Sequence, residues 1–537
     1  MHPTRLLLGV TITLVLLGLT SCGGGGGSTL AGNVVGNNGA GGLGGTGNSN
    51  GWVQGVFKPS SGFAGKCASP RSGTSDVQGT STDENNFLRS WTNELYLWYS
   101  EVPDLDPSTY STAAAYFPLL KTSATTASGA PKDKFHFTYP TTVWDQLSQS
   151  GVSVGYGAIF FLAQAAPPRS ILVAFVQPSS SSQATTPALT ANLTRGATIL
   201  SIDGVDAINA DDQASLDTLN EGLSPTKAAS HTFVIQDPGS SSTRMITMAA
   251  QSINETTVPV VAKIPVNSTQ VGYMLFNDHL ATSEAELINA VNTLQGVHDL
   301  FLDIRYNGGG YLDIADELAY MIAGPVPTGS GSATFENIQF NDKHPTTDPV
   351  TGKALTPTTF HTTSEGFSVT AGQPLPSLDL SRVFVLVGPD TCSASESIIN
   401  GLRGLSGVQV ILVGSTTCGK PYGFYPQGNC GTTYFSIEFQ GVNAMGQGGY
   451  SDGFSPMNQQ SGTIGVTLPG CSVADDFGHA LGSSNEEMLQ VALAYSTNPS
   501  CSVPPSGSSL ATMKRAMPPG HVLSVRSPLR EMRILRP

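Results

Sequence analysis

The sequence has few charged side chains for its length. Lys, Arg, Asp and Glu make up 12% of its 537 residues, about half of the ~25% that is usual for globular domains. The formal net charge is −14 and the pI is about 5.0. A nucleic-acid partner is therefore not expected, because phosphate binding needs a basic face. Hydrophobic residues reach 39%, so the chain can bury a core and has room for two or three domains.

The sequence also lacks metal-binding motifs and, after the N-terminus, membrane-spanning segments. No pair of cysteines or histidines has the spacing of zinc ligands, and the motif His-Glu-x-x-His does not occur, so we expect no metal and no other cofactor. After the N-terminus, no segment is apolar enough to span a membrane, which takes about 20 consecutive apolar residues.

The N-terminus reads as an export signal. Arg5 precedes the apolar run 6–19, which has the charged start and short apolar stretch of a secretory signal. The sequence Leu-Thr-Ser-Cys22 then resembles the lipobox of bacterial lipoproteins. That resemblance implies removal of residues 1–21, lipid attachment at Cys22 and, because Gly23 follows, an outer-membrane anchor in the bacterial cell envelope, facing the periplasm or the surface. The alternative is an ordinary signal peptide with a chance cysteine.

Six cysteines remain after Cys22, and an even number in an exported chain indicates disulfides. They are Cys67, Cys392, Cys418, Cys430, Cys471 and Cys501. The single pair that we favour is Cys418–Cys430, because twelve residues fit a hairpin between two strands. The alternative is a set of buried free thiols.

Composition and periodicity divide the mature chain into five parts. They are a Gly/Ser-rich tether over 22–66, a small helical region over 67–147, a β-rich domain over 148–255, an α/β domain over 256–500 and a disordered tail over 501–537. The tether has too few large apolar groups to order itself. In the helical region, one face of a helix that starts near Asp83 carries apolar side chains at helical spacing. These are Phe87, Leu88, Trp91, Leu95 and Trp98.

The β-rich part contains a motif that resembles a PDZ domain. The PDZ pattern of a buried Leu and a Gly before "Ile-x-x-Ile-Asn-Gly" is matched by Leu193, Gly196, Ile199, Ile202 and Gly204. One position departs from the pattern, because Ala197 stands where Asp is usual.

The PDZ resemblance implies a peptide-binding groove. Such a groove adds an extended peptide as a strand, and backbone N–H groups capture its terminal carboxylate. By position, the helix over 211–219 would line the groove, and the carboxylate loop would be Val152, Ser153, Val154 and Gly155. The alternative is a small β-domain that binds no peptide.

From residue 256 onward, apolar strands alternate with helices. Strands are expected over 271–276, 300–304, 383–387 and 410–413, with helices between them. Such βαβ alternation predicts an α/β domain with parallel pairing. Because the carboxyl ends of parallel strands meet at one edge, a site is expected there.

Three polar segments follow these strands. The first, Asp303-Ile-Arg-Tyr-Asn-Gly-Gly-Gly-Tyr-Leu312, is a Gly-rich turn whose amides can approach an anion closely; the phosphate alternative lacks the lysine of a P-loop. The second, Gly388-Pro-Asp-Thr-Cys-Ser-Ala-Ser-Glu396, places Ser393 just before a helix, where the following amides face a developing negative oxygen. The alternative is a plain helix cap. The third is Cys418-Gly-Lys420.

Together and in this order, "Asp-x-Arg-x-Asn-x-Gly-Gly", "Ser-Ala-Ser-Glu" and "Gly-Lys" resemble the S41 family of tail-specific, C-terminal processing peptidases. The resemblance implies an N-terminal region, a PDZ domain and an α/β core, and polypeptide substrates. It implies that Ser393 is the nucleophile, that Lys420 is the general base, and that the amides of Gly309 and Ala394 bind the oxyanion. Ser395 is the rival nucleophile.

The match has one departure and leaves alternatives open. Phe424 stands where many tail-specific proteases place a Gln that orients the lysine. Some S41 relatives use a histidine base instead, and His279 is the candidate for that role. The other function classes are a non-catalytic peptide- or ligand-binding protein on the same fold and a Ser–His ester hydrolase, for which His479 is the candidate.

Overall fold

The computed structural model describes residues 52–180, 183–458, 465–501, 523 and 533–535. All of them fall in one structural unit, Trp52–Pro537. Among these residues, no helix is long and apolar enough to cross a membrane. Cys22 and the signal sequence lie outside the described residues, so the lipid anchor stays a prediction.

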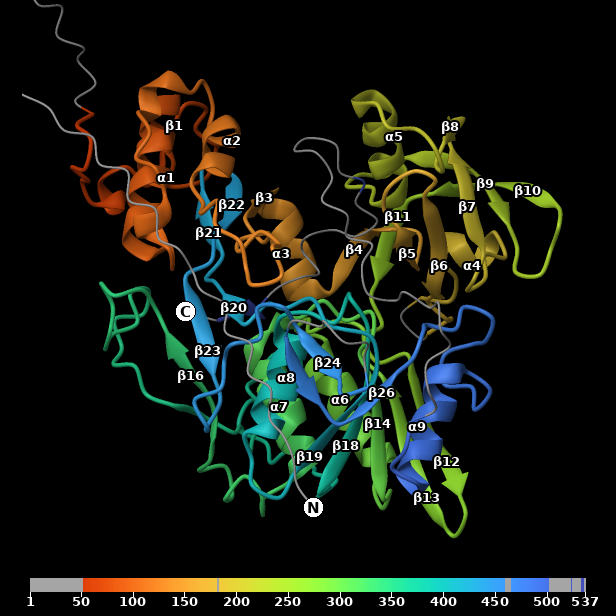
Figure 1. Ribbon diagram of the computed structural model, residues 1–537. Helices are drawn as coiled ribbons and strands as arrows, with labels where there is room; N and C mark the ends of the chain where they lie inside the picture. Colours follow the sequence, from red (N-terminus) through yellow and green to blue (C-terminus); the bar gives the residue numbers. More distant parts are fainter. Residues whose placement is uncertain (1–51, 181–182, 459–464, 502–522, 524–532, 536–537) are drawn as a thin grey trace, which may run out of the picture. The chain divides into compact units, whose positions relative to one another are not determined.

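The α/β part is built on a six-stranded sheet with the strand order β12-β13-β14-β18-β19-β26 (Figure 1). Its strands span Val260–Val266, Thr269–Leu275, Asp299–Asp303, Arg382–Val387, Gln409–Gly414 and Gly470–Ser472. β12 pairs with β13 antiparallel, and the other pairs are parallel. All five residues of β14 are buried, as expected where helices cover both faces of a parallel sheet. The predicted α/β core is confirmed.

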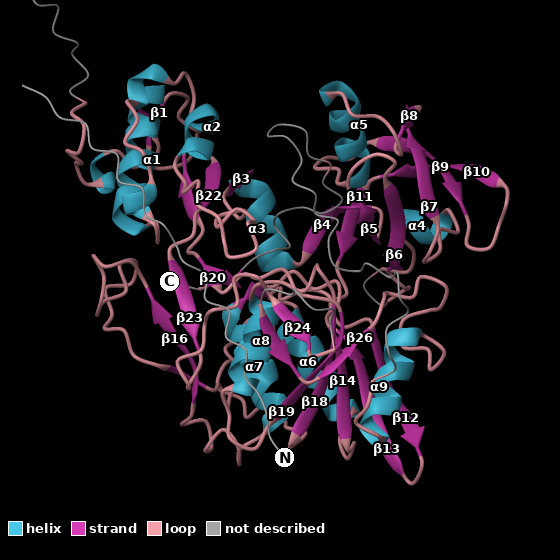
Figure 2. Ribbon diagram, in the orientation of Figure 1, coloured by secondary structure: helices cyan, strands magenta, loops and turns pink. Residues whose placement is uncertain are grey.

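Helices cover both faces of this sheet (Figure 2). They are α6 (Ser283–Thr293), α7 (Leu312–Ala323) and α8 (Ala394–Arg403) on one face and α9 (Glu487–Thr497) on the other. Successive side chains of a strand point to opposite faces. Accordingly, Val383 and Val385 pack with α6, α7 and α8, whereas Phe384 and Leu386 pack with α9.

The β-rich part forms a second sheet, with the strand order β10-β9-β7-β6-β5 and β8 beside β7. Strands β5 to β10 span Ala158–Gln164, Ser170–Val176, Thr198–Ile202, Val205–Asp206, Ser230–Gln236 and Thr243–Ala249, and the helices are α4 (Pro187–Thr190) and α5 (Gln213–Leu223). The motif residues Leu193, Ile199 and Ile202 are buried in its core. β5 is an edge strand, because β6 is its only neighbour in the sheet.

The N-terminal region is helical, as predicted. It contains α1 (Ser81–Leu95), α2 (Ala113–Tyr116) and α3 (Thr141–Ser150). α1 begins with a capping box, in which the Thr80 side chain accepts from the Asp83 amide and the Asp83 carboxylate accepts from the Thr80 amide. Such a box satisfies two amides that the helix leaves unpaired. The helix ends at Leu95, so Trp98 follows the helix rather than belonging to its face.

The tether prediction is wrong for residues 52–66. Arg89 donates hydrogen bonds to the carbonyl oxygens of Val53 and Val56, and β1 (Lys66–Cys67) pairs with β2 (Val77–Gln78). Side-chain and backbone bonds therefore order this part of the chain before α1.

Several small sheets of short strands pair segments that are distant in sequence. β3 (Phe137–Pro140) of the N-terminal region pairs with the hairpin of β21 (Gln427–Asn429) and β22 (Thr432–Phe435). Another sheet joins β17 (Thr358–Thr359), β16 (Thr334–Gln339), β23 (Phe439–Val442) and β20 (Tyr422–Gly423). Three pairs complete the set: β4 (Val152–Gly155) with β11 (Gln251–Asn254), β24 (Phe454–Pro456) with β25 (Val466–Leu468), and β15 (Gly310–Tyr311) with β27 (Arg533–Ile534).

Three disulfides are present, and the favoured pair is not among them. The bonds are Cys67–Cys430, Cys392–Cys418 and Cys471–Cys501. The Cys418–Cys430 prediction is wrong because the hairpin begins only at Gln427, so Cys430 sits in its turn and faces the N-terminal region. The predicted disorder of the tail is wrong for Arg533–Ile534, which forms a strand.

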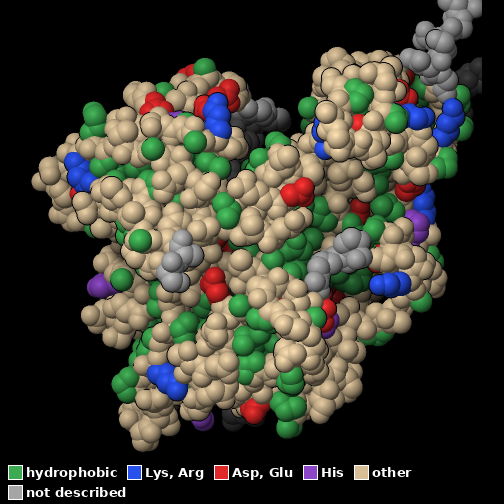
Figure 3. All heavy atoms as spheres, turned by 180° about the vertical axis from the view of Figure 1, so that it is seen from behind, with side chains coloured by type: hydrophobic (Ala, Val, Ile, Leu, Met, Phe, Trp, Pro, Cys, Tyr) green, Lys and Arg blue, Asp and Glu red, His purple; other side chains and the backbone are tan. Residues whose placement is uncertain are grey.

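The low charge content is visible on the surface. Seen from behind, Lys, Arg, Asp and Glu side chains are scattered over the molecule among uncharged groups (Figure 3). On that face they do not gather into one large patch of a single sign.

Candidate active site

Ser393 stands at the junction between β18 and α8. Its backbone has φ 63° and ψ −117°, a conformation that costs a non-glycine residue about 1–3 kcal/mol and is found mostly at functional sites. The side chain is fully buried, and its Oγ has no hydrogen-bond partner among the described residues. Burying a hydroxyl without a hydrogen-bond partner costs free energy as well. Both costs are expected at a site where the hydroxyl has to stay available for a reacting group.

The carboxylate of Glu396 binds the backbone amides of both Ser393, the candidate nucleophile, and Lys420, the candidate base. Its Oε2 accepts from the Ser393 amide at 3.0 Å and from the Lys420 amide at 2.8 Å. Its Oε1 accepts from the Gly419 amide at 2.9 Å and from the Thr417 hydroxyl. Burial raises the pKa of Glu396, and the hydrogen bonds from Thr417 and these amides act in the opposite direction.

The backbones of Ser393 and Lys420 are therefore neighbours, since their amides share one oxygen atom. The Cys392–Cys418 disulfide joins the same two segments a second time. The sequence predicted that these segments meet at one edge of the sheet, and the structure brings them together.

The side chain of Lys420 is buried between two rings. Its Nζ lies 4.5 Å from the centroid of Phe135 and 4.7 Å from that of Phe424. The Oγ of Ser393 accepts no bond from it in this arrangement. Phe424, which departs from the family pattern, is thus one of the two rings that hold the amine.

Asn307 connects the Gly-rich turn to the turn of Ser393. Its carbonyl oxygen accepts from the Cys392 amide at 3.1 Å and from the Ser395 hydroxyl at 2.9 Å. The hydroxyl of Ser395 is therefore bound to the backbone, whereas that of Ser393 is not. This difference favours Ser393 over its rival as the nucleophile.

The two proposed oxyanion donors differ. Ala394 is the first residue of α8, and its amide donates to no other described residue. The amide of Gly309 donates to Asn307 Oδ1 at 2.9 Å. In this arrangement the Gly309 amide is occupied, so its oxyanion role stays a prediction that requires this bond to be exchanged.

His279 is a buried residue beside the Gly-rich turn. Its Nδ1 lies 3.0 Å from Asn307 Oδ1, and its Nε2 has no partner among the described residues. Burial lowers its pKa to about 3, against the hydrogen bonds with Asn307 and Gly309. The other histidine candidate, His479, is half exposed and contacts Asp476 rather than the residues around Ser393.

His279→Gln should make stability less sensitive to acid. The unfolded imidazole takes up a proton as the pH falls through its ordinary pKa of 6.5, whereas the folded one stays neutral down to about 3. The wild type therefore loses stability between pH 6.5 and pH 3. In urea titrations, the deficit of the variant should shrink by up to about 3 kcal/mol from pH 7 to pH 4. A constant deficit would show that the ring titrates alike in both states.

Arg305 belongs to the Gly-rich motif, but its side chain contacts acidic residues away from Ser393 and Lys420. Its guanidinium is buried and bonds Asp303, Asp475 and Glu486. Asp475 also binds Arg195 of the β-rich part at 2.7 Å. The motif arginine thus links the end of β14 to the β-rich part. The sequence did not reveal this role because Asp475 and Glu486 lie 170 and 181 residues away from Arg305.

A cavity of about 160 Å³ lies between α3, the β-rich part and the segment before His279. Val152, Ser153, Val154 and Gly155 line it, but as strand β4 paired with β11 rather than as a loop. The predicted loop conformation is therefore wrong, whereas the assignment of these four residues to peptide binding stays a prediction. The turn that does open toward β5 is Tyr156–Gly157, and the amides of both its residues donate to no other described residue.

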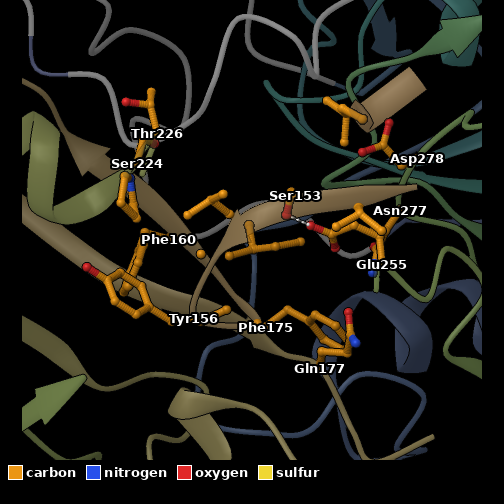
Figure 4. Close-up of a pocket in the computed structure, with 18 of the residues that line it drawn as sticks. Ser153, Tyr156, Phe160, Phe175, Gln177, Ser224, Thr226, Glu255, Asn277 and Asp278 are labelled. Carbon is orange, nitrogen blue, oxygen red and sulfur yellow. Dashed lines mark hydrogen bonds between the residues drawn. The ribbon is translucent and has the colours of Figure 1, made fainter. Parts of the chain in front are cut away.

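Figure 4 shows how side chains surround this cavity. Ser153 points at Glu255 and donates a hydrogen bond to it, and Tyr156, Phe160 and Phe175 lie along one side. Asn277 and Asp278, which directly precede His279, line the same cavity. The cavity therefore extends from the β-rich part to the segment before His279.

One cluster near the site has metal-ligand residue types. Cys392, Glu396 and Cys418 place their ligand atoms within 4.8 Å of one another. The two sulfurs are joined in a disulfide and so are not the thiolates that bind metals. The donor set therefore does not fit a metal ion.

Comparison with known proteins gives two family matches. Residues 270–423 match the model of peptidase family S41, and residues 83–138 match the peptidase S41 N-terminal domain. No curated protein matches the chain.

Two solved structures are similar to this chain to different degrees. A candidate S41 protease from Bacteroides fragilis is similar with a TM-score of 0.54 and 21% identity, over 76% of this chain and 97% of that chain. The photosystem II D1 C-terminal processing protease is similar with a TM-score of 0.41 and 17% identity, over 73% of this chain and 94% of that chain. The first likeness shows the fold, and the second is too weak to support an argument.

Proposed function

We propose that this chain, a serine-type peptidase whose residues 270–423 match peptidase family S41, is an endopeptidase that cleaves exported polypeptides recognised through their carboxyl termini. The observation that carries the catalytic part is the shared Glu396 oxygen, which fixes Ser393 beside Lys420. A Ser–Lys pair needs this proximity, since the amine must take the proton of the hydroxyl.

In the proposed mechanism, neutral Lys420 accepts the proton of Ser393 as its Oγ attacks the scissile carbonyl. The amide of Ala394, at the positive end of α8, faces the developing oxyanion. The leaving amine takes a proton, an acyl-enzyme remains on Ser393, and water then hydrolyses it. This mechanism requires the amine of Lys420 to turn from the rings of Phe135 and Phe424 toward Oγ.

Three features support recognition of carboxyl termini. β5 has an open edge, and an extended peptide can add to such an edge as a strand. The cavity lies between the start of β5 and the end of α5, from Leu223 to Thr226. The amides of Tyr156 and Gly157, with Gly157 at φ 73°, form the kind of turn that binds a carboxylate.

Amidation of a substrate's carboxyl terminus should slow its hydrolysis. Loss of charge-assisted hydrogen bonds worth about 1.5–3 kcal/mol corresponds to a fall of roughly 10- to 100-fold in kcat/KM. The fall should come mainly from KM, because the carboxylate lies away from the scissile bond. Paired peptides that differ only in this group, followed by mass spectrometry, measure the effect.

A second peptide pair serves as the control. N-terminal acetylation removes a charge of similar size at the other end of the same peptide and should leave kcat/KM within about twofold, since no contact is proposed there. Equal rates for the free and amidated peptides would contradict recognition through the carboxyl terminus and leave the peptidase activity standing.

A further inference from the structure

The chain's own C-terminal strand lies against both segments that we assign to catalysis. β27 pairs in parallel with β15, at Gly310↔Arg533 and Tyr311↔Ile534. On its other side, Ile534 bridges Phe424 in parallel, and the Leu535 amide donates to the Phe424 carbonyl. β15 begins at Gly310, the last residue of the triple glycine, and Phe424 lies four residues after Lys420.

The side chain of Ile534 is anchored in the same place. It is 2% exposed and packs in a cluster that includes Leu280, Cys392 and Phe424. Leu280 follows His279, and Cys392 precedes Ser393. Phe135 and Phe424, the two rings around the amine of Lys420, belong to this cluster as well.

The tail has a second anchor in the β-rich part. Leu523 is 4% exposed and packs in the core cluster of that sheet. Residues 523–537 also carry four arginines and one glutamate in a chain of net charge −14. The tail is thus opposite in charge to the rest of the molecule, which favours its retention.

We propose that the C-terminal segment around Ile534 occupies the binding site of an extended substrate and thereby inhibits the enzyme. Extended peptides bind at sheet edges as added strands, through backbone hydrogen bonds and through side chains that enter pockets. β27 likewise pairs with β15 and Phe424 through its backbone and buries the side chain of Ile534. The inference rests on the proposed peptidase function. A covalently attached strand competes at an effective concentration that can reach the millimolar range, so incoming polypeptides must displace it.

Ile534→Asp in the full chain should release the tail. A buried aspartate cannot remain in the apolar cluster without a partner, so we expect kcat/KM for an external peptide to rise at least about 10-fold. The matched control is Val326→Asp, which makes the same change of an aliphatic side chain at a site that is 88% exposed; it should leave the rate unchanged. Equal rates for Ile534→Asp and the control would overturn the proposal.

A binding measurement decides the same question without turnover. In a Ser393→Ala background, a fluorescent peptide of residues 523–537 should bind the Ile534→Asp chain at least about 10-fold more tightly than the chain with its native tail. The same peptide with Asp at position 534 should bind neither chain. Equal binding of the native peptide to both chains would overturn tail occupancy. Absence of hydrolysis in every chain would instead overturn the peptidase function.

Discussion

Replacing Ser393 by alanine should lower peptide hydrolysis by at least about 10³-fold, because the acyl-enzyme can no longer form. The fold should survive the change. The Oγ of Ser393 has no partner among the described residues, so its removal breaks no hydrogen bond there, and alanine meets the same backbone cost at φ 63°. Single-turnover kinetics and thermal unfolding of the same preparation measure the two effects.

The matched control is Ser395→Ala, two residues further along. That hydroxyl donates to Asn307 at 2.9 Å, so the control should lose about 1 kcal/mol of stability and keep its activity within about 10-fold. An inactive Ser395→Ala beside an active Ser393→Ala would reverse the assignment. Activity retained in both variants would rule out a serine nucleophile in this turn.

Lys420→Met should lower kcat by about 10²- to 10⁴-fold, the usual loss when a general base is removed. Methionine is flexible and apolar, so it can fill the space between the rings of Phe135 and Phe424. Labelling of Ser393 by a fluorophosphonate should slow in parallel, because that reaction also requires an activated hydroxyl. Both rates should be measured on protein with a wild-type unfolding transition.

His279→Gln is the control for the base. Glutamine can still donate to Asn307 Oδ1, and we expect kcat within about 10-fold of the wild type if the ring is structural. A large loss in His279→Gln together with an active Lys420→Met would transfer the role of base to the histidine. In that outcome the enzyme would be a Ser–His peptidase on the same fold.

The sequence predicted the elements of the site because each lies at the end of an apolar run. The run before Ser393 is β18, and its last five residues are buried. The run before Lys420 is β19, which pairs with β18 in parallel. Parallel neighbours bring their carboxyl ends together, so the meeting of the two segments followed from strand order.

Contacts between residues that are distant in sequence could not be predicted from the pattern of any single segment. Two partners of Arg305, Asp475 and Glu486, and the partner of Cys430 are distant in sequence, and nothing near Arg305 or Cys430 indicates which distant residue it contacts. The strand β27 has only two residues, too few to show a period, and it forms because β15 and Phe424 offer it partners. The PDZ resemblance places the residues of β4 in a loop, although β11, almost a hundred residues later, makes them a strand.

The Cys392–Cys418 bond bears on when the enzyme becomes competent. Thiols are kept reduced in the cytosol and oxidise in compartments outside it. A newly made chain would therefore hold the turn of Ser393 and the segment of Lys420 together through the Glu396 hydrogen bonds alone. With the export that the N-terminal sequence predicts, this disulfide would form only after the chain has left the cytosol, and the proteins of the cytosol would not meet the fully cross-linked protease.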